Sequence, residues 1–170
     1  MTVEEALRTA LAYEHKVRDH FHRAAEHTRD PRAKWFFQTM AREEQGHVDY
    51  LEAKLKEWTA RGTLAPGEIA TAVPDREWLA RGMEQLEPEG EPPADRPVVR
   101  EYLFEALRME QEVSAFYRRL VESVGRPDAE ALFRRFLEIE DGHTALVQAE
   151  IDYETHTGYF FDLREFTLDG

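Results

Sequence analysis

Two Glu-x-x-His motifs in this 170-residue chain have side chains that can bind metal ions, and one further Glu precedes each motif. The six residues are Glu14, Glu44, His47, Glu110, Glu140 and His143. Within each motif the Glu and the His are three residues apart, so they are neighbours on one face of a helix. Each single Glu stands 30 positions before the Glu of its motif, from 14 to 44 and from 110 to 140.

All six residues interrupt stripes of apolar residues that recur every three or four positions. Such stripes form the interior of a helical protein, and ionised carboxylates almost never lie fully buried there without a partner. The stripes contain no Lys or Arg that would supply the opposite charge. Two divalent metal ions would supply it, because the four carboxylates carry −4 in total and the two ions carry +4.

This set of ligands is typical of four-helix bundles that hold two iron or two manganese ions. In those bundles two helices carry a Glu and a His three residues apart, and the other two carry a single Glu. Oxygen-rich sites with one imidazole per ion suit iron or manganese better than zinc. Two alternatives stay open, namely solvated Glu residues beside ordinary core histidines, and a helical bundle that has lost its metal.

Four segments show helical periodicity, and we expect helices over residues 3–28, 31–59, 97–124 and 127–155. Asp30-Pro31 and Pro127-Asp128 place N-terminal helix signals at the start of the second and fourth segments. Because very short turns join the first pair and the last pair, each pair predicts an antiparallel hairpin. We also expect a solvated face for four histidines that fall mostly outside the first apolar stripe: His15, His20, His22 and His27.

The second hairpin repeats the first with a shift of 96 residues and no gap. Sixteen of the 51 positions from 3 to 53 are identical, about a third, against roughly 7% for unrelated sequences of average composition. The repeated positions include all six candidate ligands. The repeat therefore predicts an all-α four-helix bundle in which the ligands meet around a pseudo-two-fold axis.

The hairpins are connected by residues 60–96, which contain five prolines. Proline at this density breaks helices, so we expect a long crossover connection rather than a fifth core helix. A short helix near Asp75–Leu86 within it would bury Trp78, Leu79 and Met83.

Residues 156–170 form an aromatic C-terminal segment that includes Tyr159-Phe160-Phe161. We expect this segment to pack on the bundle or on a second subunit, because exposed aromatic clusters are rare in monomers. The hairpins 3–59 and 97–155, the crossover and this segment together are expected to form a single domain over 1–170.

The chain carries a formal net charge of −13 and contains no cysteine. The acidic balance argues against nucleic acid or an anionic membrane as a partner, because both attract basic surfaces. The lack of cysteine excludes disulfides, thiolate nucleophiles and cysteine-bound metal. No apolar run approaches the roughly 20 residues of a membrane-spanning helix, and the acidic start of the chain is unlike a signal peptide, so we expect a cytoplasmic protein.

The motifs and their spacing resemble those of the rubrerythrin and ferritin-like superfamily of di-iron carboxylate proteins, over both hairpins. The resemblance implies a ferritin-like four-helix bundle that holds two iron ions, with manganese as the other metal to consider. It also implies that Glu44 and Glu140 bridge the ions, while the terminal ligands are Glu14 with His47 and Glu110 with His143. From the residues alone, the identity of the bridging carboxylates stays open.

The resemblance implies a non-haem di-iron oxidoreductase that reduces peroxide or dioxygen. Rubrerythrins carry a cysteine-bound iron domain and an extra carboxylate on the third helix, whereas this chain has no cysteine and has Val113 at that position. An external electron donor is therefore expected. The alternative is a ferroxidase or an iron-binding or storage protein. Cage-forming ferritins usually end in a fifth helix, whereas this sequence has an aromatic segment there, which argues against a storage cage. We expect a homodimer for the enzyme and a closed shell of many subunits for a storage protein.

Tyr117 is the candidate catalytic residue, seven positions after Glu110. Its hydroxyl would bond a ligand carboxylate or relay an electron, or it is an ordinary core tyrosine. The corresponding residue in the first hairpin is Phe21, so such a role is confined to one half of the site. Glu43 adjoins a motif Glu but points about 100° away on the helix, so it is expected outside the ligand set.

Overall fold

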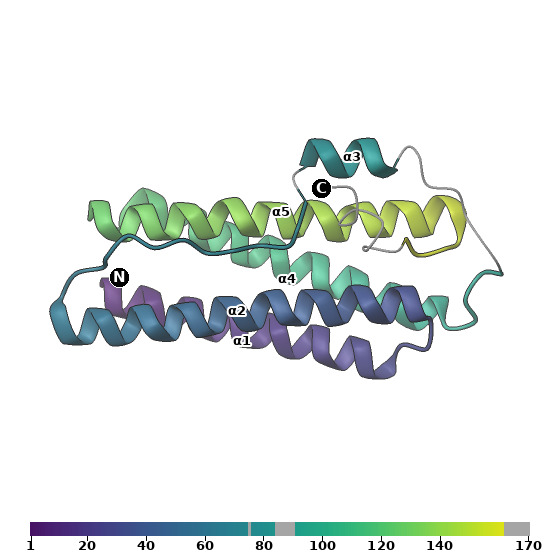
Figure 1. Ribbon diagram of the computed structural model, residues 1–170, viewed down its shortest axis with the longest axis horizontal. Coiled ribbons are helices and arrows are strands. Elements are labelled where there is room, and N and C mark those ends of the chain that lie inside the picture. The colour runs from purple at the N-terminus through teal and green to yellow at the C-terminus, as the bar shows by residue number, and fades with distance from the viewer. Residues whose placement is uncertain (75, 84–90, 162–170) are drawn as a thin grey trace.

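Four long helices form a bundle in the computed structural model, which describes residues 1–74, 76–83 and 91–161 (Figure 1). The four long helices are α1 (Val3–His27), α2 (Pro31–Arg61), α4 (Arg96–Ser123) and α5 (Pro127–Thr157), and the short helix α3 (Arg76–Met83) lies between α2 and α4 in the chain. There is no strand among these described residues. The all-α prediction is confirmed, and each boundary expected for the four long helices lies within two residues of the observed one.

The ends of the helices follow from local sequence. Thr2 and Glu5 form a reciprocal capping box at the start of α1, and Asp30 accepts hydrogen bonds from two backbone N–H groups at the start of α2. Helices α2 and α5 both have 31 residues, and both end at a glycine in the left-handed conformation, Gly62 (φ 65°) and Gly158 (φ 82°). These glycines are 96 residues apart, so the repeat extends to the ends of the hairpins.

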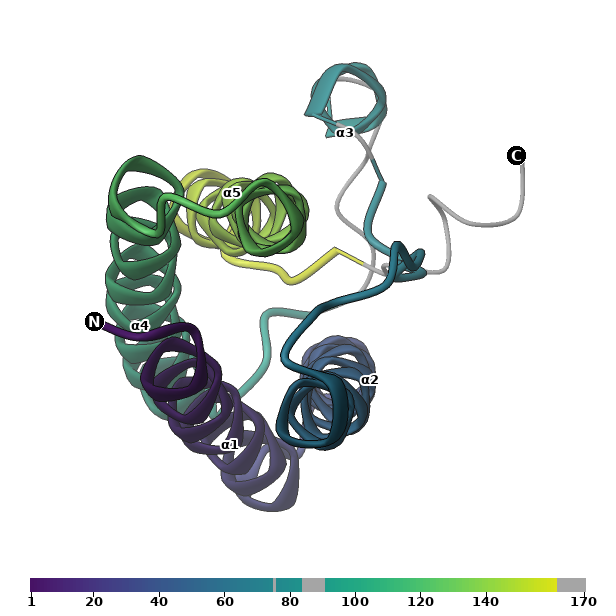
Figure 2. The same cartoon turned by 90° about the vertical axis from the view of Figure 1, so that its left-hand side faces the viewer.

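Helix α1 packs on α2, α4 packs on α5, and α1 also lies beside α4 (Figure 2). The backbone N–H of Arg29, in the turn between α1 and α2, donates to Asp95 just before α4 at 2.6 Å. The backbone N–H of Leu64, just after α2, donates to Asp128 of α5 at 3.1 Å. Helix α4 therefore begins beside the α1–α2 turn, and α5 begins where α2 ends. No helix in the described part of the chain is both long and apolar enough to cross a membrane.

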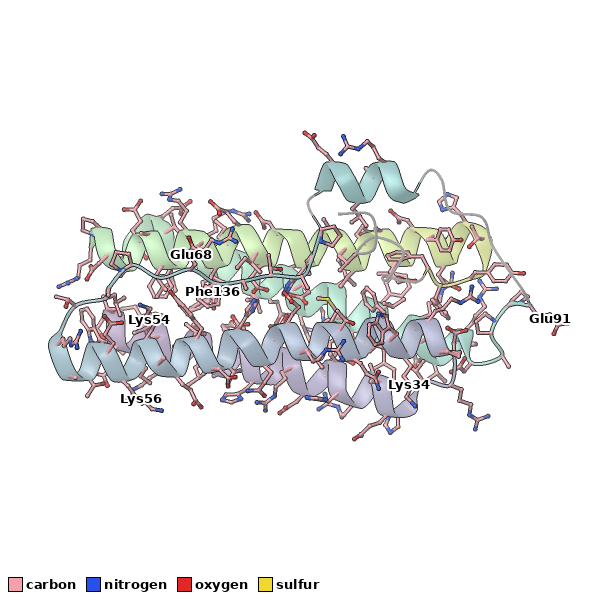
Figure 3. All side chains as sticks on the ribbon, in the orientation of Figure 1. Lys34, Lys54, Lys56, Glu68, Glu91 and Phe136 are labelled. Carbon is pink, nitrogen blue, oxygen red and sulfur yellow. The ribbon has the colours of Figure 1, made fainter. Side chains whose placement is uncertain are left out.

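The crossover runs along the bundle between α2 and α5 before it reaches α3 (Figure 1). Lys54 of α2 donates to the carbonyl of Ala65 at 2.6 Å, and Arg135 of α5 donates to the carbonyl of Ile69 at 3.4 Å. The crossover is thus hydrogen-bonded to both helices. Figure 3 labels Lys54, which points from α2 toward this segment.

Helix α3 packs on α5 and is shorter than expected within the described residues. Its Leu79 is buried, as predicted. Residues 75 and 84–86 of the expected helix lie outside the described residues, as do the side chains of Trp78 and Met83.

The aromatic segment after α5 packs on the bundle, as expected for residues as far as 161; residues 162–170 lie outside the described part. Phe160 and Phe161 are buried, and the Phe161 ring meets the Phe36 ring edge-on, with centroids 6.4 Å apart. The backbone N–H of Phe161 donates to the Glu150 carboxylate at 3.1 Å. Glu150 and Lys54 are equivalent positions of the repeat, so the same helical position anchors the chain after each hairpin.

Candidate metal centre

The structure places all six candidate ligands in the interior, each with at most 1% of its surface exposed: Glu14, Glu44, His47, Glu110, Glu140 and His143. Helices α1 and α4 each supply one Glu, and α2 and α5 each supply a Glu and a His. The spacing of three residues puts the Glu and His of each motif side by side, facing the other motif across the bundle. The rings of His47 and His143 lie nearly parallel, at 7°, with centroids 5.2 Å apart.

His47 turns its Nδ1 atom toward three carboxylates. This atom lies 3.2 Å from Glu14 Oε2, 3.3 Å from Glu44 Oε2 and 3.2 Å from Glu140 Oε1. The three carboxylates come from three different helices, so the arrangement exists only in the assembled bundle.

His143 repeats this arrangement on the other side. Its Nδ1 atom lies 2.9 Å from Glu44 Oε1, 3.5 Å from Glu140 Oε2 and 3.9 Å from Glu110 Oε1. Glu44 and Glu140 therefore each turn one oxygen toward each histidine. Of the two histidines, Glu14 faces only His47 and Glu110 faces only His143, among the ion-pair contacts of the described residues.

The donor atoms of this cluster suit metal ions. Ligand atoms of Glu44, His47, Glu140 and His143 all lie within 4.8 Å of one another. Among the described residues, the oxygens of Glu110 make no well-formed hydrogen bond, and those of Glu44 face only the two histidines of the same cluster. Buried polar atoms are normally hydrogen-bonded, so such a concentration of unpartnered donor atoms calls for another charge. Carboxylate and imidazole groups in this number can hold two divalent ions.

The carboxyl groups of Glu14 and Glu110 hold protons readily. Burial raises the pKa of Glu14 and of Glu110 well above the usual value, and the neighbouring carboxylates raise it further. A charged group is disfavoured in a dry interior that contains other charges of the same sign. Both groups are therefore protonated more easily than an exposed Glu.

The pKa values of the two histidines are also raised, whereas those of the two shared carboxyl groups are lowered. Burial opposes the charge on His47 and His143, but the surrounding carboxylates raise the pKa of both well above the usual value. Burial likewise opposes the charge on Glu44 and Glu140, yet the two histidines hold the pKa of both carboxyl groups below the usual range. The pattern is that of two imidazolium groups facing two carboxylates.

Tyr117 reaches the cluster from α4. Its hydroxyl donates to Glu14 Oε1 at 2.5 Å, and its ring stacks on Phe136 with centroids 5.0 Å apart. Phe136 also meets the His47 ring edge-on, and Figure 3 shows it between α5 and α2. Burial raises the pKa of the Tyr117 hydroxyl well above its usual value, so the phenol keeps its proton. Phe21, its counterpart in the repeat, is fully buried.

Glu43 lies beside the candidate ligand His143, a contact that the sequence did not indicate. Its Oε2 atom lies 3.8 Å from His143 Nε2, on the side of the ring away from the cluster. The carboxylate also accepts hydrogen bonds from Thr71 Oγ1 at 2.8 Å and from the Ala72 N–H at 2.9 Å. No helical periodicity signals this contact, because two of its partners belong to the crossover.

His20 corrects the expectation of a solvated histidine face. It is fully buried, and its Nε2 atom lies 2.9 Å from the carbonyl oxygen of Tyr102 on α4. The position is covered because α1 packs on α4 as well as on α2. His22 and His27 are exposed and His15 is half-buried.

No family model matches the chain, and comparison with curated proteins and with solved structures finds no match either. The geometry and chemistry of the buried cluster are therefore what indicates a function for this chain.

Proposed function

We propose that this protein is a non-haem di-iron oxidoreductase of the rubrerythrin and ferritin-like type. It would bind two iron ions, or manganese, and reduce peroxide or dioxygen with electrons from an external donor. The observation that carries the proposal is the pair of matching donor sets, in which each His Nδ1 faces its own Glu and one oxygen of each shared Glu.

This geometry supports one assignment of ligands. Glu14 and His47 would hold one ion, Glu110 and His143 would hold the other, and Glu44 and Glu140 would bridge both. The four ionised carboxylates and two divalent ions would form a neutral unit, which a dry interior tolerates. When bound, the pair of ions supplies two electrons and Lewis acidity for the cleavage of an O–O bond.

The chain's own residues exclude water and fix the ligands. Phe136 and Phe133 are fully buried and pack around Tyr117, so the cluster is closed by aromatic rings on that side. Tyr117 holds its proton and donates it in a hydrogen bond to Glu14. Tyr117 contacts a ligand rather than a reacting atom, so we propose it as a positioning residue.

Metal analysis of two variants tests the ligand assignment. Anaerobic addition of Fe(II) to the wild type should load two ions per chain, whereas Glu44→Ala and His143→Ala should lose them and keep their helical circular dichroism. Glu52→Gln, at an exposed position of the same helix α2, should load two ions as the wild type does. Two ions per chain in Glu44→Ala or His143→Ala would refute the assignment.

The reaction of the loaded protein tests the chemistry. Stoichiometric loss of the Fe(II) state on addition of peroxide, with repeated turnover once a reductant is supplied, is the expected result. Oxidation by dioxygen followed by release or accumulation of ferric iron would instead favour the ferroxidase or storage alternative. A protein that binds no iron would be a bundle without a metal centre.

A further inference from the structure

The two halves of the cluster match in their ligands but differ in the residues that contact those ligands. Tyr117 donates to Glu14, whereas its counterpart Phe21 has no hydroxyl, and neither oxygen of Glu110 makes a well-formed hydrogen bond within the described part of the chain. Glu14 therefore has one oxygen engaged by a phenol before any ion arrives, while Glu110 has no hydroxyl beside it from the equivalent position.

The histidines differ in the same way. Glu43 places a carboxylate 3.8 Å from His143 Nε2, whereas its counterpart in the repeat is Ile139, which offers no acceptor. Among the described residues neither His47 Nε2 nor His143 Nε2 makes a hydrogen bond, so the difference between the two rings is the charge of the Glu43 carboxylate beside His143. A carboxylate at the far nitrogen of a ligand histidine favours the tautomer with the proton on that nitrogen, which leaves Nδ1 free for a metal.

Both differences act in the same direction. A hydrogen bond to Glu14 lowers the electron density that this carboxylate offers to an ion, and a carboxylate beside His143 raises the basicity of that imidazole. From these contacts we infer that the two metal positions are inequivalent, and that the position at Glu110 and His143 binds its ion more tightly and fills first. This inference rests on the proposed function, since it needs the cluster to hold two ions.

The crossover contacts the residues around the metal position at Glu110 and His143. Thr71 and Ala72 donate two hydrogen bonds to Glu43 and hold its carboxylate toward His143. The connection between the hairpins thus fixes the orientation of one ligand. The other hairpin is followed by the aromatic segment, for which the described residues show no such contact to His47.

The repeat suggests the substitutions to test. Where one hairpin has a residue that contacts a ligand, the equivalent position of the other hairpin shows which residue lacks that contact. Tyr117→Phe reproduces Phe21, and Glu43→Ile reproduces Ile139. Anaerobic calorimetric titration of the metal-free protein with Co(II), followed in parallel by visible absorption, reports the affinity and number of binding steps. Thermal unfolding of each metal-free variant checks that the fold is retained.

We expect two separate steps in the wild type. Glu43→Ile should weaken the tighter step by roughly 10–100-fold and leave the weaker one unchanged. Tyr117→Phe frees Glu14 from a hydrogen bond to a charged group, so it should strengthen the weaker step by roughly tenfold and leave the tighter one unchanged, and the double variant should bring the steps together. Glu43→Gln, which keeps a polar acceptor, should recover part of the loss.

Two ions bound with equal affinity in the wild type, or two steps that neither substitution moves, would overturn the inference while leaving the metal centre itself intact. A shift of both steps by the same factor in either variant would also overturn it, since a merely structural effect would act on both positions. A wild type that binds no Co(II), Mn(II) or Fe(II) would instead overturn the proposed function.

Discussion

Binding of two divalent ions should release protons, because protons and metal ions compete for the same buried side chains. Four groups of the metal-free cluster have raised pKa values: Glu14, Glu110, His47 and His143. With these four protons in place, two positive imidazolium groups balance the two remaining carboxylates. The metal-loaded cluster reaches the same neutrality with two ions and no protons. About four protons should therefore leave for each pair of ions.

The size of this effect follows from the charge balance. Each proton displaced makes the binding constant of the ion pair tenfold more favourable per pH unit, so four protons correspond to about 5 kcal/mol per pH unit. The dependence applies below the raised pKa values and declines as the pH passes each of them. A pair of exposed Glu-x-x-His motifs would release fewer than two protons at about pH 6, all of them from its histidines, since its carboxyl groups would already be ionised.

Calorimetry measures the released protons directly. Mn(II) is titrated into metal-free protein at about pH 6 in several buffers with different ionisation enthalpies, and the slope of observed heat against buffer enthalpy gives the number of protons. The exposed-site variant Glu52→Gln should give the wild-type number. Two ions bound with fewer than about two protons released would show that the carboxyl groups of Glu14 and Glu110 were already deprotonated, and the reasoning from buried charge would be wrong.

The metal-free protein should be most stable near about pH 4.5. As the pH rises above this value, Glu14 and Glu110 lose their stabilisation, because they bind more protons in the folded state, and His47 and His143 lose theirs above about pH 6.5. As the pH falls below about 4.5, Glu44 and Glu140 lose theirs. Thermal unfolding in a chelator across pH checks this, and a melting temperature that keeps rising to pH 9 would contradict it. Mn(II) at about 100 times its dissociation constant should add about 2.7 kcal/mol per ion, or about 5 kcal/mol for two ions. Two ions should therefore raise the melting temperature of a protein of this size by about 10–20 °C in a thermal shift assay, and no shift would mean that the folded state has no preference for the ion. Phe161→Ala should lower the free energy of unfolding in urea by about 3 kcal/mol, because the ring is buried against Phe36. The control Phe104→Ala removes a ring that is 52% exposed and should change it by less than about 0.5 kcal/mol, and equal effects would show that the aromatic segment does not pack as described.

The placement of the six candidate ligands shows how far local sequence patterns reach. A Glu at position 14 or 110 within an apolar stripe indicates a buried charge, and the repeat indicates that both hairpins bring the same ligands to the centre. The sequence did not decide which carboxylates lie between the histidines. That depends on how α2 and α5 are rotated about their axes, and the structure shows Glu44 and Glu140 with one oxygen toward each ring.

The contacts outside the ligand set were harder to predict. Glu43 meets Thr71 and Ala72 of the crossover, which has no periodic pattern that would indicate where it lies. His20 is off the apolar stripe of α1 facing α2, but a second helix, α4, covers it. In both cases the partner belongs to an element whose position depends on the whole fold.

The sequence by itself determined the helices, the two hairpins and the residues able to bind metal, because hydrophobic periodicity, capping residues and the 96-residue repeat are properties of neighbouring positions along the chain. Only the tertiary structure decided the asymmetry of the centre, in which Tyr117 reaches Glu14 and Glu43 reaches His143. Tyr117 and Glu14 are 103 residues apart, and Glu43 and His143 lie on different helices. Contacts of this kind depend on the rotation and offset of packed helices, which no pattern within one helix specifies.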